Sequence, residues 1–140
     1  MYDSTITLFN FHEKSGKWFS TIIPKADLLV NRSSSSTSGG VNGEDSIEII
    51  VKCTPAKSVN GKEYLPPKQY AKCDYPANYF TFKPESDFIY DGEWLSSQEI
   101  LDDDYDEGFY HAMNDEYDGV YMVTSAAFFS LLPHFEIGGK

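Results

Sequence analysis

Short runs of β-branched and aromatic residues, separated by glycine, proline or asparagine turns, recur along the chain and limit its fold more than any other feature. The run SIEIIVKC at residues 46–53 is the clearest example. Such side chains suit the pleated surface of a strand, and closely spaced turns favour antiparallel neighbours. The sequence therefore predicts a mainly β (α+β) fold, an antiparallel β-barrel or sandwich of about seven to nine strands.

The same pattern predicts where individual strands end. Pro24 cannot donate a hydrogen bond to a neighbouring strand, so we expect it to end the second strand. Asp91-Gly92 is expected to close a hairpin, and Asn60-Gly61 to form a tight turn. The segments expected to be extended are residues 4–9, 18–23, 27–32, 46–53, 78–83, 87–90, 93–95, 120–124, 128–132 and 134–137.

Two segments are expected to be helical. A short helix is predicted near residues 67–73, because Pro66-Pro67 precedes it and proline is tolerated in a first helical turn. One longer helix is predicted near residues 103–117, where apolar side chains recur at helical spacing. This stripe packs into the core or docks on a neighbouring molecule, and we favour the core. The stripe consists of Tyr105, Phe109, Ala112 and Met113.

The chain length of 140 residues suits one hydrophobic core, so residues 1–140 are predicted to form a single domain. The segment SSSSTSGGVNG at residues 33–43 is small and polar. It lacks the apolar area needed to order itself, and we expect a flexible loop there. This loop is interpreted either as a tolerated surface insertion or as a segment that orders on assembly.

Charge is distributed unevenly along the chain, whose net charge is −11. Residues 1–70 carry eight Lys/Arg and seven Asp/Glu, whereas residues 84–139 carry fourteen Asp/Glu and no Lys/Arg. Such a field repels phosphate, which argues against sequence-specific nucleic-acid binding and against an anionic membrane. A basic protein surface is a better partner. The candidate partner-binding residues are Asp103, Asp104, Glu107, Asp115, Glu116 and Asp118.

The acidic run that begins at Asp102 resembles a calcium loop only in part. The aspartates alternate as in an EF-hand loop, at Asp102, Asp104 and Asp106. An EF-hand loop also requires Gly at its sixth position and a bidentate Glu at its twelfth. Counted from Asp102, this chain has Glu107 and Met113 at those positions. We predict no metal site, and these three aspartates are only weak candidates. The run is otherwise interpreted as charge at a helix N-terminus, or as a patch that faces a basic partner.

No motif for catalysis or for a cofactor is present in the sequence. The chain has no GxSxG, HExxH or phosphate-binding glycine loop, so we predict a non-enzyme without a cofactor. Cys53 and Cys73 are interpreted as reduced thiols, because no signal peptide is recognised and a cytoplasmic location is expected. His12, His111 and His134 have no metal-ligand spacing, and we expect His111 to pair with Glu107.

Several strings resemble, in order and spacing, the small minor capsid or head–tail joining proteins of phages and prophages of Gram-positive bacteria. Those proteins begin with a TLYN-like strand, carry a D-x-[IV]-x-x-G hairpin, and end in a V-T … P-H-x-x-[IV] strand pair. The corresponding strings are TITLFN (5–10), WFSTII (18–23), YLPPKQY (64–70), NYFTF (78–82), DFIYDGE (87–93), VTS (123–125) and PHFEIGGK (133–140).

The resemblance implies a non-enzymatic β-barrel that forms a homo-oligomeric ring in the virion neck. Its partners would be other neck, portal and tail proteins. It would be cytoplasmic in the host before assembly and part of the virion afterwards. An acidic surface suits a channel that must not adsorb DNA phosphates. The alternative function is a monomeric acidic binding module, or an inhibitor, of a basic host protein.

Overall fold

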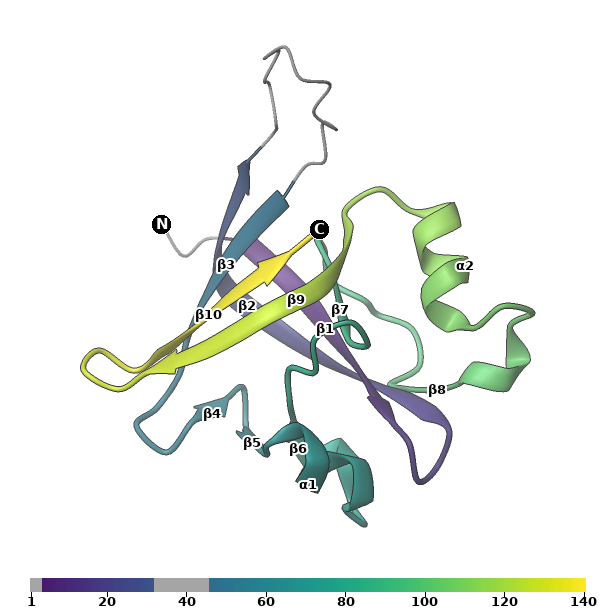
Figure 1. The fold of residues 1–140 in the computed structure, drawn as a ribbon, viewed down its shortest axis with the longest axis horizontal. Helices are drawn as coiled ribbons and strands as arrows, with labels where there is room; N and C mark the ends of the chain where they lie inside the picture. Colours follow the sequence, from purple (N-terminus) through teal and green to yellow (C-terminus); the bar gives the residue numbers. More distant parts are fainter. Residues whose placement is uncertain (1–3, 32–45) are drawn as a thin grey trace.

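The computed structural model describes residues 4–31 and 46–140, in which the chain forms ten strands, two α-helices and two 3-10 helices (Figure 1). The predicted loop at residues 33–43 lies outside the described residues. The barrel strands are β1 (Ser4–His12), β2 (Lys17–Asn31), β3 (Ser46–Lys52), β7 (Phe88–Tyr90), β9 (Val120–Phe129) and β10 (His134–Gly139). The other strands are β4 (Ser58–Val59), β5 (Lys62–Tyr64), β6 (Tyr79–Phe80) and β8 (Glu99–Leu101). The helices are α1 (Pro67–Lys72), η1 (Pro76–Asn78), η2 (Asp102–Asp104) and α2 (Phe109–Glu116).

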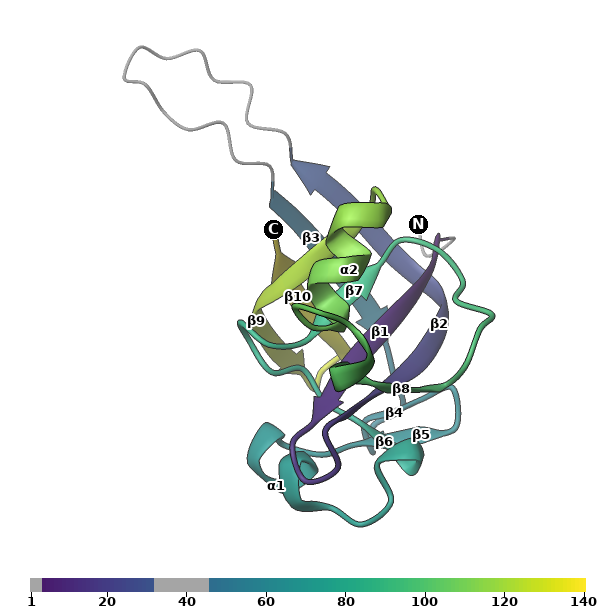
Figure 2. The same ribbon diagram turned by 90° about the vertical axis from the view of Figure 1, so that its right-hand side faces the viewer.

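Six antiparallel strands close into a barrel in the order β1-β7-β9-β10-β3-β2, and β2 pairs back onto β1. Strand β8 extends the sheet from β2, and β4, β5 and β6 form a small separate sheet. Helix α1 lies with this small sheet at one end of the barrel, and α2 covers the outer face of the wall (Figure 2). The predicted fold class, a mainly antiparallel β-barrel or sandwich, is confirmed.

Strand β2 is continuous, so the prediction that Pro24 ends a strand is wrong. Pro24 lies at a shift in register, since Ile23 pairs with Ile6 before it and Ala26 pairs with Ser4 after it. The hydrogen-bond ladder between β1 and β2 is irregular at this point, so the backbone N–H that proline lacks is not needed there. Beyond this point β2 leaves β1 and pairs with β3. The bent strand thus has a different neighbour in each half, which closes the barrel.

The core has two parts, one on each side of the barrel wall. Because successive side chains of a strand point to opposite faces, β1 contributes Ile6 and Leu8 to the interior and Phe9 to the outer layer. The Phe9 ring stacks on Phe88 at 4.8 Å and meets Phe109 of α2 at 5.3 Å between ring centroids. The buried residues of the outer layer are Phe9, Trp18, Phe88, Ile100, Phe109, Met113 and Val120.

Helix α2 begins at Phe109, so the helix predicted near residues 103–117 is too long at its N-terminal side. Gly108 separates η2 from α2 with a φ of +93°, a backbone conformation that cannot continue a helix. Phe109 and Met113 are each no more than 2% exposed, which confirms the predicted inward stripe at these positions. Tyr105 precedes the helix and is 37% exposed.

The hairpin predicted around Asp91-Gly92 does not form. Strand β7 pairs with β1 and β9, and residues 93–95 are not a strand. The Trp94 backbone N–H instead donates to Thr7 Oγ1 at 3.0 Å. Strand β8, which follows, has no counterpart among the predicted strands. Here packing against β1 and β2 overrides the local turn signal.

Of four other segments, two differ in extent from their prediction and two match it. The strands predicted at 120–124 and 128–132 are one strand, β9, and residues 130–133 form the turn into β10. The predicted strand at 78–83 shortens to β6. The short helix near residues 67–73 is confirmed as α1, with proline in its first turn. The tight turn at Asn60-Gly61 is also confirmed, with both residues at positive φ.

Candidate protein-binding surfaces

The turn between β9 and β10, with the residue before it, forms an apolar tip at one end of the long axis of the molecule (Figure 1). We call residues 129–133 the hairpin tip. Leu131 is 93% exposed, Leu132 is 77% exposed and Phe129 is 43% exposed. Single exposed leucines are ordinary on protein surfaces, but several together on a projecting turn are typical of a binding surface. The sequence prediction placed residues 128–132 in a strand and missed this surface.

Contacts at its base hold the hairpin tip in place. The His134 ring stacks on Phe129 with 5.0 Å between ring centroids and an interplanar angle of 10°. In the neighbouring pair of the β9–β10 ladder, the Phe128 and Phe135 rings pack with 5.3 Å between their centroids. Lys57 Nζ lies 4.7 Å from the centre of the Phe128 ring. A surface that is already ordered loses less conformational entropy on binding than a free loop does.

His134 has two acceptor partners, one for each ring nitrogen. Nδ1 lies 2.6 Å from the Leu132 carbonyl oxygen, and Nε2 lies 2.9 Å from a Glu136 carboxylate oxygen. Both partners only accept hydrogen bonds, so both are satisfied only when the ring carries two N–H groups. The hydrogen bond to Glu136, with that to the Leu132 carbonyl, raises the pKa of His134 above its ordinary value.

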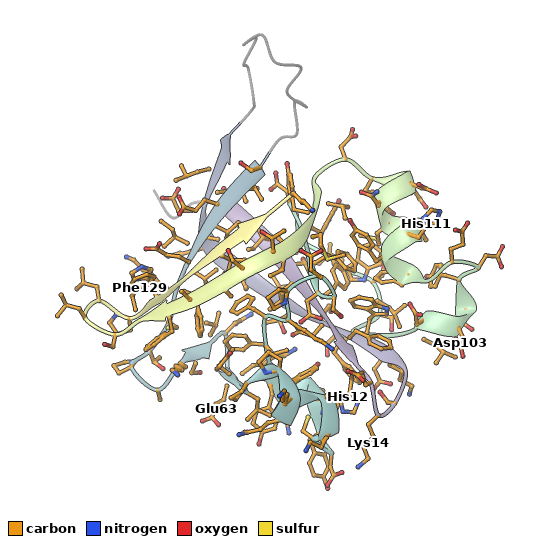
Figure 3. The ribbon with its side chains drawn as sticks, viewed as in Figure 1. His12, Lys14, Glu63, Asp103, His111 and Phe129 are labelled. Carbon is orange, nitrogen blue, oxygen red and sulfur yellow. The ribbon has the colours of Figure 1, made fainter. Side chains whose placement is uncertain are left out.

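The acidic surface lies at the opposite end of the long axis, on η2, α2 and the turns beside them (Figure 3). Every partner-binding residue predicted from the sequence is exposed there: Asp103, Asp104, Glu107, Asp115, Glu116 and Asp118. His111 lies among them, with Nε2 3.6 Å from Glu107 and 3.1 Å from Asp115. The predicted pair of His111 with Glu107 is therefore present, and Asp115 is a second partner.

Exposed apolar side chains also lie on this acidic surface. Leu101, Tyr105 and Tyr117 are between 36% and 39% exposed, and each is next in sequence to an acidic residue. Acidic residues and partly exposed tyrosines side by side suit a protein partner that is both basic and apolar.

Asp102 differs from the aspartates that follow it, because its carboxylate is used within the fold. Its Oδ1 accepts hydrogen bonds from the Trp18 indole N–H at 2.8 Å and from the Phe109 backbone N–H at 2.9 Å. Asp102 therefore accepts one of the free backbone N–H groups in the first turn of α2, although it lies seven positions earlier in the sequence. Asp102, Asp104 and Asp106 do not converge, and residues 4–31 and 46–140 contain no group of three His, Cys, Asp or Glu placed to hold a metal ion.

A buried polar cluster between β1 and residues 81–87 was not predicted from the sequence. Asn10 Nδ2 donates to the Asp87 carboxylate at 2.8 Å and to the Thr81 carbonyl at 2.6 Å. Asp87 also accepts the backbone N–H groups of Phe11 and Lys83. Burial is the largest influence on Asp87 and raises its pKa to about 7, against the opposing effect of these hydrogen bonds. The alternation along β1 that buries Ile6 and Leu8 also points Asn10 inward.

A cleft of about 470 Å³ lies between the β1–β2 turn and the segment that follows α1. His12 lines it but is 2% exposed, with Nε2 2.8 Å from the Cys73 carbonyl and Nδ1 2.7 Å from Ser15 Oγ. Because the carbonyl can only accept, Nε2 of His12 carries a proton that it donates to the Cys73 carbonyl. Burial raises the pKa of both the Cys53 and Cys73 thiols, which disfavours the reactive thiolate.

The molecule is a closed six-strand barrel with an ordered apolar tip at one end of its long axis and an acidic, tyrosine-bearing surface at the other. The chain belongs to a family of unknown function, DUF6751, whose model matches residues 1–140. No curated protein and no solved structure matches it. In the part of the chain that the structure describes, no helix is long and apolar enough to cross a membrane.

Proposed function

We propose that this chain is a non-enzymatic structural protein that acts through protein–protein contacts, as a ring in the neck of a phage or prophage virion. It would be made in the host cytoplasm and join portal or tail proteins on assembly. The observation that carries the proposal is the hairpin tip, where Leu131 and Leu132 project from the end of the β9–β10 hairpin with exposures of 93% and 77%. Exposed apolar groups on a rigid support favour binding to another protein.

The resemblance noted in the sequence supports the more specific part of the proposal. Five of its seven strings include barrel-strand residues: 5–10 lie on β1, 18–23 on β2, 88–90 on β7, 123–125 on β9 and 134–139 on β10. A rigid barrel with unlike ends suits a ring subunit, because contacts between unlike surfaces close into rings when the rotation permits. An acidic surface also suits a neck through which DNA passes without adsorbing.

Deletion of the gene from the phage or prophage that carries it tests the proposal. Electron micrographs of the lysate should then show DNA-filled heads and separate tails, and a plasmid copy of the gene should restore joined particles. A plasmid copy with both Leu131 and Leu132 changed to Ser should fail to restore them. Normally joined particles after deletion, or a gene without portal, capsid or tail genes beside it, would contradict the neck assignment.

The second candidate is a monomeric acidic module that binds a basic host protein. It is favoured by the exposed acids on η2 and α2 in a region without Lys or Arg. Sedimentation of the purified chain with its partner separates the two functions. A neck protein should give a closed oligomer, alone or on the partner's ring, whereas the module should give a one-to-one complex that weakens as salt is raised.

A further inference from the structure

The two candidate surfaces lie at opposite ends of one molecule. Phe129 of the hairpin tip is at one end of the long axis, and Asp103 and His111 are at the other (Figure 3). The tip belongs to β9 and β10, whereas the acidic surface belongs to η2 and α2. Both can therefore be occupied at the same time, by two different neighbours.

The two ends are complementary in charge. At the base of the tip, Lys57 lies over the Phe128 ring and Lys52 lies opposite His134 in the β3–β10 ladder, beside the one carboxylate of β10, Glu136. At the opposite end, residues 101–118 include eight Asp and Glu residues and His111, but no Lys or Arg. Each end also offers apolar area, from Leu131 and Leu132 on one side and from Tyr105 on the other. An apolar centre with opposite charges beside it is typical of specific protein contacts.

We propose that the occupant of the hairpin tip is a second copy of this chain, and that the tip of one copy docks on the acidic surface of the next. This inference rests on the proposed function, since it names the contact that would build the ring. Pairing of like ends is disfavoured, because two tips would bring lysines together and two acidic surfaces would bring carboxylates together. The contact is therefore head-to-tail, which allows ring closure.

Two variants, each blocking one end, test the proposal by complementation. Leu131→Asp with Leu132→Asp removes the apolar tip and sets acids against the acidic surface. Asp103→Lys with Asp104→Lys reverses charge at the other end and leaves Asp102 in place. Each variant alone should sediment as a monomer at concentrations where the wild type associates. An equimolar mixture should restore association, because one variant supplies an intact tip and the other an intact acidic surface.

Matched controls keep the same chemistry away from both surfaces. Leu95→Asp changes another leucine that is 80% exposed, and Glu63→Lys reverses an exposed charge on β5. Both should associate as the wild type does. Circular dichroism melts should show that all the variants fold. If the aspartates at the tip prevent folding, Leu131→Ser with Leu132→Ser replaces them.

Each remaining outcome overturns the inference. A wild type that stays monomeric up to about 1 mM lacks the contact. Association that survives in either blocked variant means that copies meet through other surfaces, which leaves a ring in the neck possible. Two blocked variants that do not combine when mixed exclude the head-to-tail contact. The deletion phenotype decides the proposed neck function separately from all of these results.

Discussion

The Asp102 carboxylate accepts a hydrogen bond from the Phe109 backbone N–H at 2.9 Å, and through it the acidic run is connected to the first turn of α2. The same oxygen accepts the Trp18 indole N–H at 2.8 Å. A single side chain therefore links β2, η2 and α2. This connection explains why the helix begins where it does, and it separates Asp102 from the exposed acids that follow.

Asp102→Ala should destabilise the fold by about 2–3 kcal/mol, because it leaves the nearly buried Trp18 N–H and the first N–H of α2 without their acceptor. Urea unfolding measures the change. Asp102→Asn keeps the acceptor oxygen and should recover much of the loss, whereas Asp103→Ala should change stability by less than about 0.5 kcal/mol. If Asp102→Ala and Asp103→Ala changed the free energy of unfolding equally, Asp102 would contribute only its charge and not its two hydrogen bonds.

Phe109→Ala should lower the free energy of unfolding by about 3–5 kcal/mol. The ring is 1% exposed and packs between Phe9 and Trp94 in the outer layer. Thermal melts of mutant and wild type measure the shift, and Tyr105→Ala is the control for an exposed aromatic residue nearby. An unchanged melting temperature for the Phe109 variant would mean that α2 does not depend on this layer.

Asp87 should make the protein less stable as pH rises from about 4 to about 7. Its pKa is about 7 in the fold and 3.8 ordinarily, so between these values the folded state binds more protons than the unfolded state. Its contribution is greatest below 3.8 and is lost as pH rises through 7, by up to about 4 kcal/mol. Unfolding free energies across this range should fall less steeply for Asp87→Asn than for wild type. Parallel curves for the Asp87 variant and wild type would contradict this.

His134 should hold its proton above its ordinary pKa of 6.5, because Glu136 and the Leu132 carbonyl both accept from its ring. The stability that it contributes is present below 6.5 and is lost as pH rises through the higher folded value. An NMR titration of the imidazole should show a lower pKa in Glu136→Gln than in wild type, and Glu48→Gln on β3 should leave it unchanged. A His134 titration that is insensitive to Glu136 would remove this pair from the base of the hairpin tip.

Local patterns in the sequence were enough to predict features that depend on near neighbours. The β-rich runs predict the strand class, Pro67 predicts the start of α1, and Asn60-Gly61 predicts its turn. The spacing of Phe109 and Met113 predicts the buried face of α2. The exposure of the acids from Asp103 to Asp118 also follows, because unpaired carboxylates are costly to bury. Each of these depends on residues within a few positions of one another.

Tertiary structure alone decided the features that join distant segments. Pro24 stays within β2 because the ladder with β1 is irregular at that point, and Asp87 is buried because Asn10, 77 positions away, lies opposite it inside the barrel. Leu131 and Leu132 have the composition of a core strand. They are exposed because β9 and β10 pair with each other as far as Phe129 and His134, which leaves the apolar residues between them on a turn. Hydropathy describes a side chain, whereas its burial depends on which strands pair, and that pairing is set by contacts across the whole chain.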